Sequence, residues 1–190
     1  MRIGLFGLAF VFAVTFATPS SANLVVNGGF ETGNFSGWTG GFPDNFVATG
    51  DTALVHSGKF GVAFGASGSL SDLSQTLTTI PGQTYSVSFW LDSNGQSPDE
   101  VKLSWGGVAN FDQSNILANG WTQYSFLETA LSTSTLLDFG LGQDSGYSGL
   151  DDISVNAVSA VPEPSTWAML LLGFVGIAVL RFRDGRVAFP

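Results

Sequence analysis

The side chains in this chain best suited to chemistry are carboxylates, and two of them stand side by side as Asp151-Asp152. A pair of acids hydrolyses a glycosidic bond only when both converge on it from positions roughly 5–10 Å apart. Neighbouring residues of a regular strand point to opposite faces, so this pair would diverge. His56 is the only histidine and there is no cysteine, which excludes His-based metal clusters and thiol chemistry. No nucleophile-elbow motif accompanies His56, so we interpret it as an ordinary loop residue and the protein as non-catalytic.

The elements that must position these residues are short alternating segments separated by Gly, Ser, Thr, Asn and Asp. Tyr85, Val87, Phe89 and Leu91 alternate with polar residues, as the strands of a half-buried sheet do. The same pattern recurs in segments 60–64, 73–80, 101–105, 121–127, 136–141 and 150–155. It predicts an all-β sandwich over residues 23–157.

The net charge of the middle region limits the classes of molecule that it could bind. Residues 23–160 contain two lysines and thirteen of the chain's fifteen acidic residues, which gives this region a formal charge of −11. Such a surface repels phosphate backbones, so we expect no nucleic-acid partner. It suits cations, neutral polymers or simple solubility.

The N-terminal segment has the pattern of a signal peptide over residues 1–22. Arg2 supplies a positive charge, an apolar stretch follows, and Ser20-Ser21-Ala22 offers small residues for cleavage. The alternatives are a buried helix or a permanent anchor. We expect cleavage after Ala22 and export of the chain.

The C-terminal segment combines a linker with a short apolar helix. Residues 158–165 form the linker and contain Pro162-Glu163-Pro164, and residues 166–190 form the helix and a basic tail. The uncharged stretch 167–180 would be about 21 Å long as a helix, against the ~30 Å of a hydrocarbon core. We therefore expect a marginal transmembrane helix, held at the inner membrane only transiently, with a cytoplasmic stop made by Arg181, Arg183 and Arg186.

The sequence "VPEPSTWAMLLLGFVGIAVLRFR" resembles the PEP-CTERM sorting signal of exported bacterial proteins. The resemblance implies recognition and removal of the tail by an exosortase-type transpeptidase, followed by release or attachment at the cell surface. In this chain Asp184 lies among the spread arginines, which departs from the family pattern. The alternative is an ordinary membrane anchor that is never cut.

The middle region is similar to galactose-binding-like domains of the carbohydrate-binding-module kind. The segments that carry the resemblance are "NLVVNGGFETGNFSGWT", "HSGKFGVAF", "LSQTLTTIPGQTYSVSFWL", "GWTQYSF" and "LDDISV". The resemblance implies a two-sheet antiparallel jelly-roll sandwich, flanked here by the N-terminal signal helix and the C-terminal transmembrane helix. It does not transfer a particular ligand.

The same resemblance implies a structural calcium ion where the first and last strands meet. It places Glu31 and one of the two aspartates beside the ion, with backbone carbonyls around Ser57 to Lys59 completing the shell. Calcium takes such oxygen ligands. We prefer Asp151 to Asp152, and the alternative is that these acids cap turns or face water.

Trp90 is the best candidate for sugar stacking. By alternation it lies on the polar face of its strand with Ser86, Ser88 and Asp92, opposite the apolar positions. We interpret Trp38, Trp105 and Trp121 as core or rim residues. The alternative for Trp90 is that strand 101–105 or a loop covers it.

We therefore predict an exported, non-catalytic module that binds carbohydrate in an extracellular polysaccharide matrix. The alternatives are a structural matrix or surface protein without a discrete ligand site and a polysaccharide-active enzyme.

Overall fold

The computed structural model describes residues 22–41, 46–65, 70–118, 120–158 and 169–177. The chain divides into two compact units, Met1–Val158 and Ser159–Pro190. The expected signal segment up to residue 21, the Pro162-Glu163-Pro164 motif and the arginines at 181, 183 and 186 lie outside the described residues.

The first unit is built from strands alone in its described residues. They are β1 (Thr39–Gly40), β2 (Phe46–Thr49), β3 (Gly61–Phe64), β4 (Ser71–Thr78), β5 (Thr84–Asp92), β6 (Asp99–Trp105), β7 (Val108–Ser114), β8 (Thr122–Thr129), β9 (Ser134–Gln143) and β10 (Ser148–Ala157). The segments that alternate in the sequence correspond to seven of these strands, and β1, β2 and β7 are additional.

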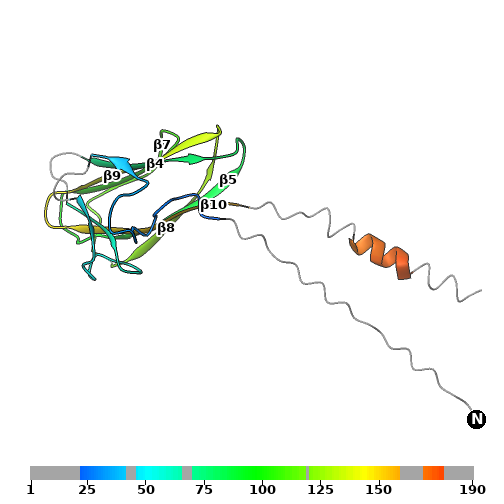
Figure 1. Ribbon diagram of the computed structural model, residues 1–190, viewed down its shortest axis with the longest axis horizontal. Coiled ribbons are helices and arrows are strands. Elements are labelled where there is room, and N and C mark those ends of the chain that lie inside the picture. Colours follow the sequence, from blue (N-terminus) through cyan, green and yellow to red (C-terminus); the bar gives the residue numbers. More distant parts are fainter. Residues whose placement is uncertain (1–21, 42–45, 66–69, 119, 159–168, 178–190) are drawn as a thin grey trace, which may run out of the picture. The chain divides into compact units, whose positions relative to one another are not determined.

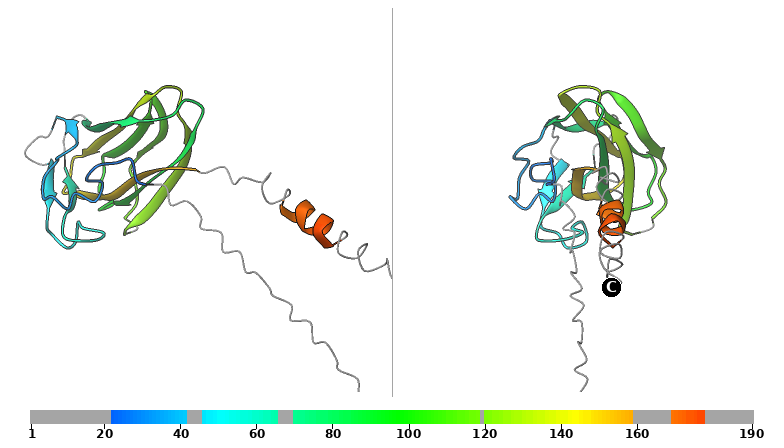
Figure 2. Two further views of the ribbon diagram at one scale, coloured as in Figure 1. Left: turned by 45° about the vertical axis from the view of Figure 1, so that its right-hand side comes forward. Right: turned by 90° about the vertical axis from the view of Figure 1, so that its right-hand side faces the viewer.

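The strands form two five-stranded sheets that pack face to face (Figures 1 and 2). One sheet has the order β1-β4-β9-β6-β7, and the other has the order β2-β3-β10-β5-β8. Every pairing is antiparallel. The expected all-β two-sheet antiparallel sandwich is confirmed.

Alternation along β5 explains how the core forms. Tyr85, Val87, Phe89 and Leu91 are almost fully buried, while the residues between them are half-buried on the other face. Phe89 meets Phe139 of the opposite sheet edge to face, with ring centroids 5.2 Å apart. Such pairs add about 0.5–1.5 kcal/mol to the stabilisation from buried area.

The two ends of the sandwich chain lie side by side. The Asn23 side chain accepts a hydrogen bond from the Val155 N–H at 2.9 Å, and the Leu24 N–H donates to the Val155 carbonyl at 2.8 Å. The Ile153 N–H donates to the Gly28 carbonyl at 3.0 Å. The N-terminal segment therefore follows the second half of β10, which carries Glu31 towards the aspartates of that strand.

The second unit contains a helix at residues 169–177, whose side chains are exposed. Within the part of the chain that the structure describes, no helix has the length and apolar character needed to cross a membrane. The expected transmembrane segment extends on both sides of this helix into residues that are not described.

Candidate functional site

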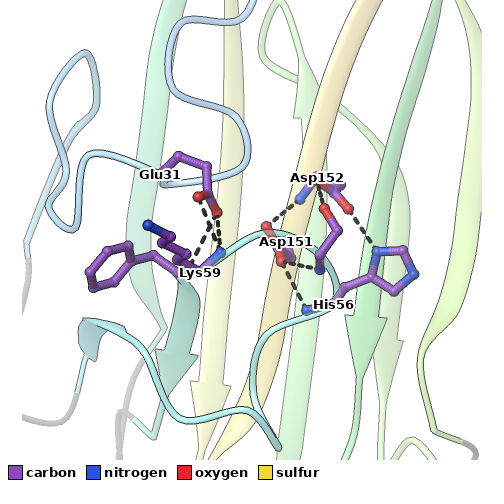
Figure 3. Close-up of polar contacts among 7 residues, drawn as sticks. Glu31, His56, Lys59, Asp151 and Asp152 are labelled. Atoms are coloured by element: carbon purple, nitrogen blue, oxygen red, sulfur yellow. Dashed lines mark hydrogen bonds and ion pairs between the residues drawn. The ribbon is translucent and has the colours of Figure 1, made fainter.

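Glu31 and Asp151 hold the same loop, residues 56–60, from two sides (Figure 3). The backbone N–H groups of Lys59 and Phe60 donate to the Glu31 carboxylate at 2.9 and 3.1 Å. Those of His56 and Ser57 donate to Asp151 Oδ2 at 2.9 and 3.2 Å. The first and last parts of the domain therefore meet at this loop, as the sequence led us to expect.

Asp151 is fully buried at the centre of this arrangement. Burial raises the pKa of Asp151 to about 6, although the backbone N–H groups of Ser57, Asp152 and His56 partly offset the shift. A buried carboxylate without a neighbouring cation favours its protonated form. A cation bound here would therefore stabilise the ionised form of Asp151.

Asp152 departs from regular strand geometry. Its φ of 49° lies in the left-handed region, and the pairing of β10 with β5 shifts register between Asp151 and Ser154. A bulge of this kind redirects a side chain. Asp152 consequently turns to the same loop as Asp151, with Oδ2 2.7 Å from His56 Nδ1 and Oδ1 accepting from Ser57 Oγ at 3.0 Å. The expectation that the two aspartates diverge fails because the strand is irregular here.

The side chains of Asp151, Asp152 and Glu31 all lie near Gly29. A Cβ added to Gly29 would lie 3.3 Å from an oxygen of Asp152, and 3.9 Å from an oxygen of Asp151 and from Cγ of Glu31. Carboxylate oxygens are the donors that calcium prefers, so the residues fit the ion in type. Among the described residues, no group of three or more His, Cys, Asp or Glu side chains is arranged to hold a metal ion. Ser57 and Lys59, expected to contribute carbonyl oxygens, contact the carboxylates through their N–H groups.

An aromatic cluster adjoins these acids on the outer face of the β2-β3-β10-β5-β8 sheet. The His56 ring stacks on Trp90, with centroids 3.8 Å apart and planes at 15°. The ring of Trp121 meets His56 edge to face at 5.4 Å. We call His56, Trp90 and Trp121 the aromatic cluster, and all three residues are half-buried. Trp90 is thus covered on one side by a loop residue, and not by strand 101–105.

Gly149 makes room for the ring of Trp121. A Cβ on Gly149 would lie 2.8 Å from Cη2 of Trp121, closer than real Cβ contacts occur. Gly149 pairs with Asp92 in the register of β10 and β5. The absent side chain therefore lets the Trp121 ring contact the sheet at Gly149, beside the row that contains Trp90.

A polar row extends from the aromatic cluster along the same outer face. Ser86, Ser88 and Asp92 alternate with the buried core positions of β5, as expected, and are half-buried. Ser88 Oγ lies 2.9 Å from Ser154 Oγ on β10. Burial raises the pKa of Asp92. Hydroxyl groups beside aromatic rings are the surface that a neutral sugar chain can contact by hydrogen bonds and by its C–H faces.

Two members of the aromatic cluster were missed by sequence reasoning. Trp121 immediately precedes β8, where alternation does not define its face, and His56 lies in a loop with no periodic pattern. Trp90 pairs with Gln123, so Trp121, two residues earlier, falls on the same face as Trp90, but this follows only once the pairing of β5 with β8 is known. No sequence signal marks His56. Trp38 and Trp105 are buried, as the core interpretation predicts.

Comparisons with known families match both parts of the chain. The family model described as a carbohydrate binding domain matches residues 22–136. The model of the PEP-CTERM protein-sorting motif matches residues 160–186, which include Pro162-Glu163-Pro164.

Individual relatives agree with the family match. Endo-1,4-beta-xylanase A of Thermoanaerobacterium saccharolyticum is 31% identical over an alignment of 112 residues, and the match covers 53% of this chain. The chain spans only 10% of the length of that enzyme.

Solved structures share the fold. The structure of TmCBM61 in complex with beta-1,4-galactotriose has a TM-score of 0.57 at 22% identity, covering 73% of this chain and all of that one. The CBM22-1 xylan-binding domain of Xyn10C from Paenibacillus barcinonensis has a TM-score of 0.56 at 18% identity, covering 76% of this chain and all of that one.

Proposed function

The chain belongs to the carbohydrate binding domain family and carries a PEP-CTERM sorting motif over residues 160–186, and we propose that it binds a neutral β-1,4-linked polysaccharide outside the cell without cleaving it. The sorting motif implies export and surface sorting. The carbohydrate ligand comes from family membership, and the linkage comes from the beta-1,4-galactotriose bound to one structural relative, while another is named as a xylan-binding domain. An extracellular polysaccharide matrix around the cell is the proposed setting.

The observation that carries this proposal is the aromatic cluster at one end of a row of hydroxyl side chains. Sugar rings present apolar C–H faces and peripheral hydroxyl groups. Partly exposed aromatic rings pack against the C–H faces, and serines such as Ser86 and Ser88 form hydrogen bonds with the hydroxyl groups. The open face of a sheet suits internal segments of a long chain, because it does not block the polymer at either end.

The negative charge of the domain favours neutral ligands over acidic ones. The region from residue 23 to residue 160 carries thirteen acids and two lysines. A polysaccharide rich in uronic acids would be repelled at low ionic strength. We therefore expect xylan and β-1,4-galactan to bind better than polygalacturonate.

A non-catalytic role is consistent with the small share of the xylanase that the match covers. The similar segment makes up a tenth of that enzyme. Asp151 accepts hydrogen bonds from the backbone N–H groups of residues 56 and 57. Asp152 interacts with the side chains of His56 and Ser57. Both acids are therefore engaged in holding the loop.

We also propose that calcium stabilises the meeting point of the first and last strands. Glu31 and Asp151 would hold it, together with carbonyl oxygens of residues 57–59. The ion would supply positive charge beside a buried carboxylate, which is structural chemistry and not catalysis.

The proposal is tested by electrophoresis of the full chain through gels that contain xylan or β-1,4-galactan. Binding retards the protein, and Trp90→Ala or Trp121→Ala should abolish the retardation. Thr76→Ala, on an exposed position of the other sheet, is the matched control. Equal retardation of the wild type and both Trp variants would refute binding at the aromatic cluster. A folded wild type that no polysaccharide retards would favour a structural surface protein.

A further inference from the structure

A pocket lies at one end of the sandwich, between the β6–β7 turn and the β8–β9 turn. We call it the end pocket, and its volume is about 510 Å³. Ligand pockets commonly occupy 300–1,000 Å³. Residues from four strands and both turns line it, among them Trp105, Val108, Asn110, Glu128, Leu131 and Leu136.

Glu128 is the unusual residue of the end pocket. It pairs with the buried Tyr85 across β5 and β8, and it continues the inward series of Tyr124 and Phe126, which pack against the core. A carboxylate therefore occupies a position where this alternation predicts an inward-facing apolar residue. Burial raises the pKa of Glu128, and a hydrogen bond with the side chain of Asn110 partly offsets the shift.

The remainder of the lining combines apolar side chains and the Trp105 indole with hydroxyl residues, which are Thr129, Ser132, Ser134 and Thr135. Val108 is 60% exposed, Leu131 is 88% exposed and Leu136 is 41% exposed. Trp105 is buried, and its indole N–H donates to the Thr129 carbonyl at 3.2 Å. The pocket thus offers C–H contacts around a carboxylate and an amide.

The charges of the residues that line the end pocket limit the kinds of ligand that it could bind. Of the described residues that line the pocket, none is basic and Glu128 is the only acid. This lining is complementary to a ligand that donates hydrogen bonds to a carboxylate, has an apolar side and carries no negative charge. A neutral sugar unit has these properties, since each of its hydroxyl groups is a donor and its ring faces carry C–H groups.

We propose that the end pocket is a second carbohydrate-binding site, which holds a short neutral saccharide through Glu128 and Asn110. The choice of a saccharide rests on the proposed function. Glu128 lies five residues along β8 from Gln123, the partner of Trp90, which is about 17 Å at 3.3–3.4 Å per residue. Glu128 also points to the inner side of its sheet. The end pocket and the aromatic cluster are therefore separate sites.

Nuclear magnetic resonance of the ¹⁵N-labelled full chain tests the two sites in one experiment. The protein is kept in a detergent without a sugar headgroup, and xylotriose, β-1,4-galactotriose and trigalacturonate are added in turn. The Trp105 indole and the Asn110 amide signals report on the end pocket, and the Trp90 and Trp121 indoles report on the aromatic cluster. Trp38, buried in the core, reports on the fold.

At least one neutral trisaccharide should shift the Trp105 and Asn110 signals, and trigalacturonate should bind at least tenfold more weakly. Glu128→Gln should raise the dissociation constant about tenfold, because a hydrogen bond to a charged group is replaced by one to a neutral amide. Asn110→Ala, on an exposed position, should also weaken binding. An unchanged Trp38 signal confirms that each variant folds.

The outcomes separate the two proposals. Shifts confined to Trp90 and Trp121 would overturn the end pocket and leave the proposed function standing. Shifts confined to Trp105 and Asn110 would support the end pocket and overturn binding at the aromatic cluster. No shift with any trisaccharide, equal affinity for trigalacturonate, or unchanged affinity in both variants would overturn the end pocket.

Discussion

His56 and Trp90 lie ring on ring, with centroids 3.8 Å apart and planes 15° from parallel, although one belongs to a loop and the other to a central strand. The same imidazole contacts Asp152 through Nδ1 at 2.7 Å. One loop residue therefore joins the acids that hold residues 56–60 to the aromatic cluster on the outer face of the sheet.

Replacing His56 tests this connection. His56→Ala should lower the free energy of unfolding by about 1–2 kcal/mol, because Trp90 loses its stacking partner and Asp152 loses a hydrogen bond. Thermal melting followed by circular dichroism measures the change. His56→Phe keeps the stacking but not the hydrogen bond, so its melting temperature should lie between those of the wild type and His56→Ala. Identical melting of all three proteins would contradict a structural role for the pair.

Gly149 should be needed for binding and not for folding. In Gly149→Ala the added methyl group would meet the Trp121 ring, which has to move away from the sheet. We expect weaker retardation in polysaccharide gels, by about tenfold in affinity, with a melting temperature within a few degrees of the wild type. Wild-type affinity in Gly149→Ala would show that the position of the Trp121 ring against Gly149 does not matter for binding.

Removal of calcium should destabilise the domain. With calcium at 100 times its dissociation constant, the ion adds about 2.7 kcal/mol to the free energy of unfolding, and EDTA removes that contribution. The measurement is thermal melting with and without chelator, repeated in Glu31→Gln and Asp151→Asn, in which the shift should disappear. The absence of any EDTA effect in the wild type would eliminate the proposed ion.

Without calcium, stability should fall as pH rises. The pKa of Asp151 is raised from 3.8 to about 6, so the folded state favours the protonated acid. Ionisation of Asp151 destabilises the folded state, and this effect is absent below pH 3.8, grows as pH rises and is complete above about pH 6. Urea denaturation in EDTA should show the wild type losing stability over this range relative to Asp151→Asn. A constant difference between the two proteins would contradict a raised pKa, and added calcium should reduce the pH dependence.

The fold was largely predictable from the sequence because alternation is strong where one face is buried. In β5, for example, buried and half-buried residues alternate in the structure as apolar and polar residues mostly do in the sequence. The edge strand β7 was not found because only Phe111 among its residues is buried, so the sequence "VANFDQS" lacks a clear period. The short strands β1 and β2 carry too few residues to show one.

The site was only partly predictable. The meeting of Glu31 and Asp151 followed from the family resemblance, and the polar face of Trp90 followed from alternation. The bulge at Asp152 could not be anticipated, because a left-handed φ at an aspartate leaves no distinct sequence pattern. The position of His56 over Trp90 depends on that bulge and on a loop whose path is set by long-range hydrogen bonds. Glu128 was also missed, since an acid near the end of a strand resembles a solvent-facing residue.

The central claim is that the aromatic cluster binds a neutral polysaccharide, and a glycan array tests it most directly. The full chain and the Trp90→Ala/Trp121→Ala double variant are applied to the same array, after circular dichroism has shown that both are folded. The account predicts that the wild type binds at least one neutral β-1,4-linked glycan and that the double variant binds it at least tenfold more weakly. Equal binding by the two proteins, or no binding by a folded wild type, would contradict it.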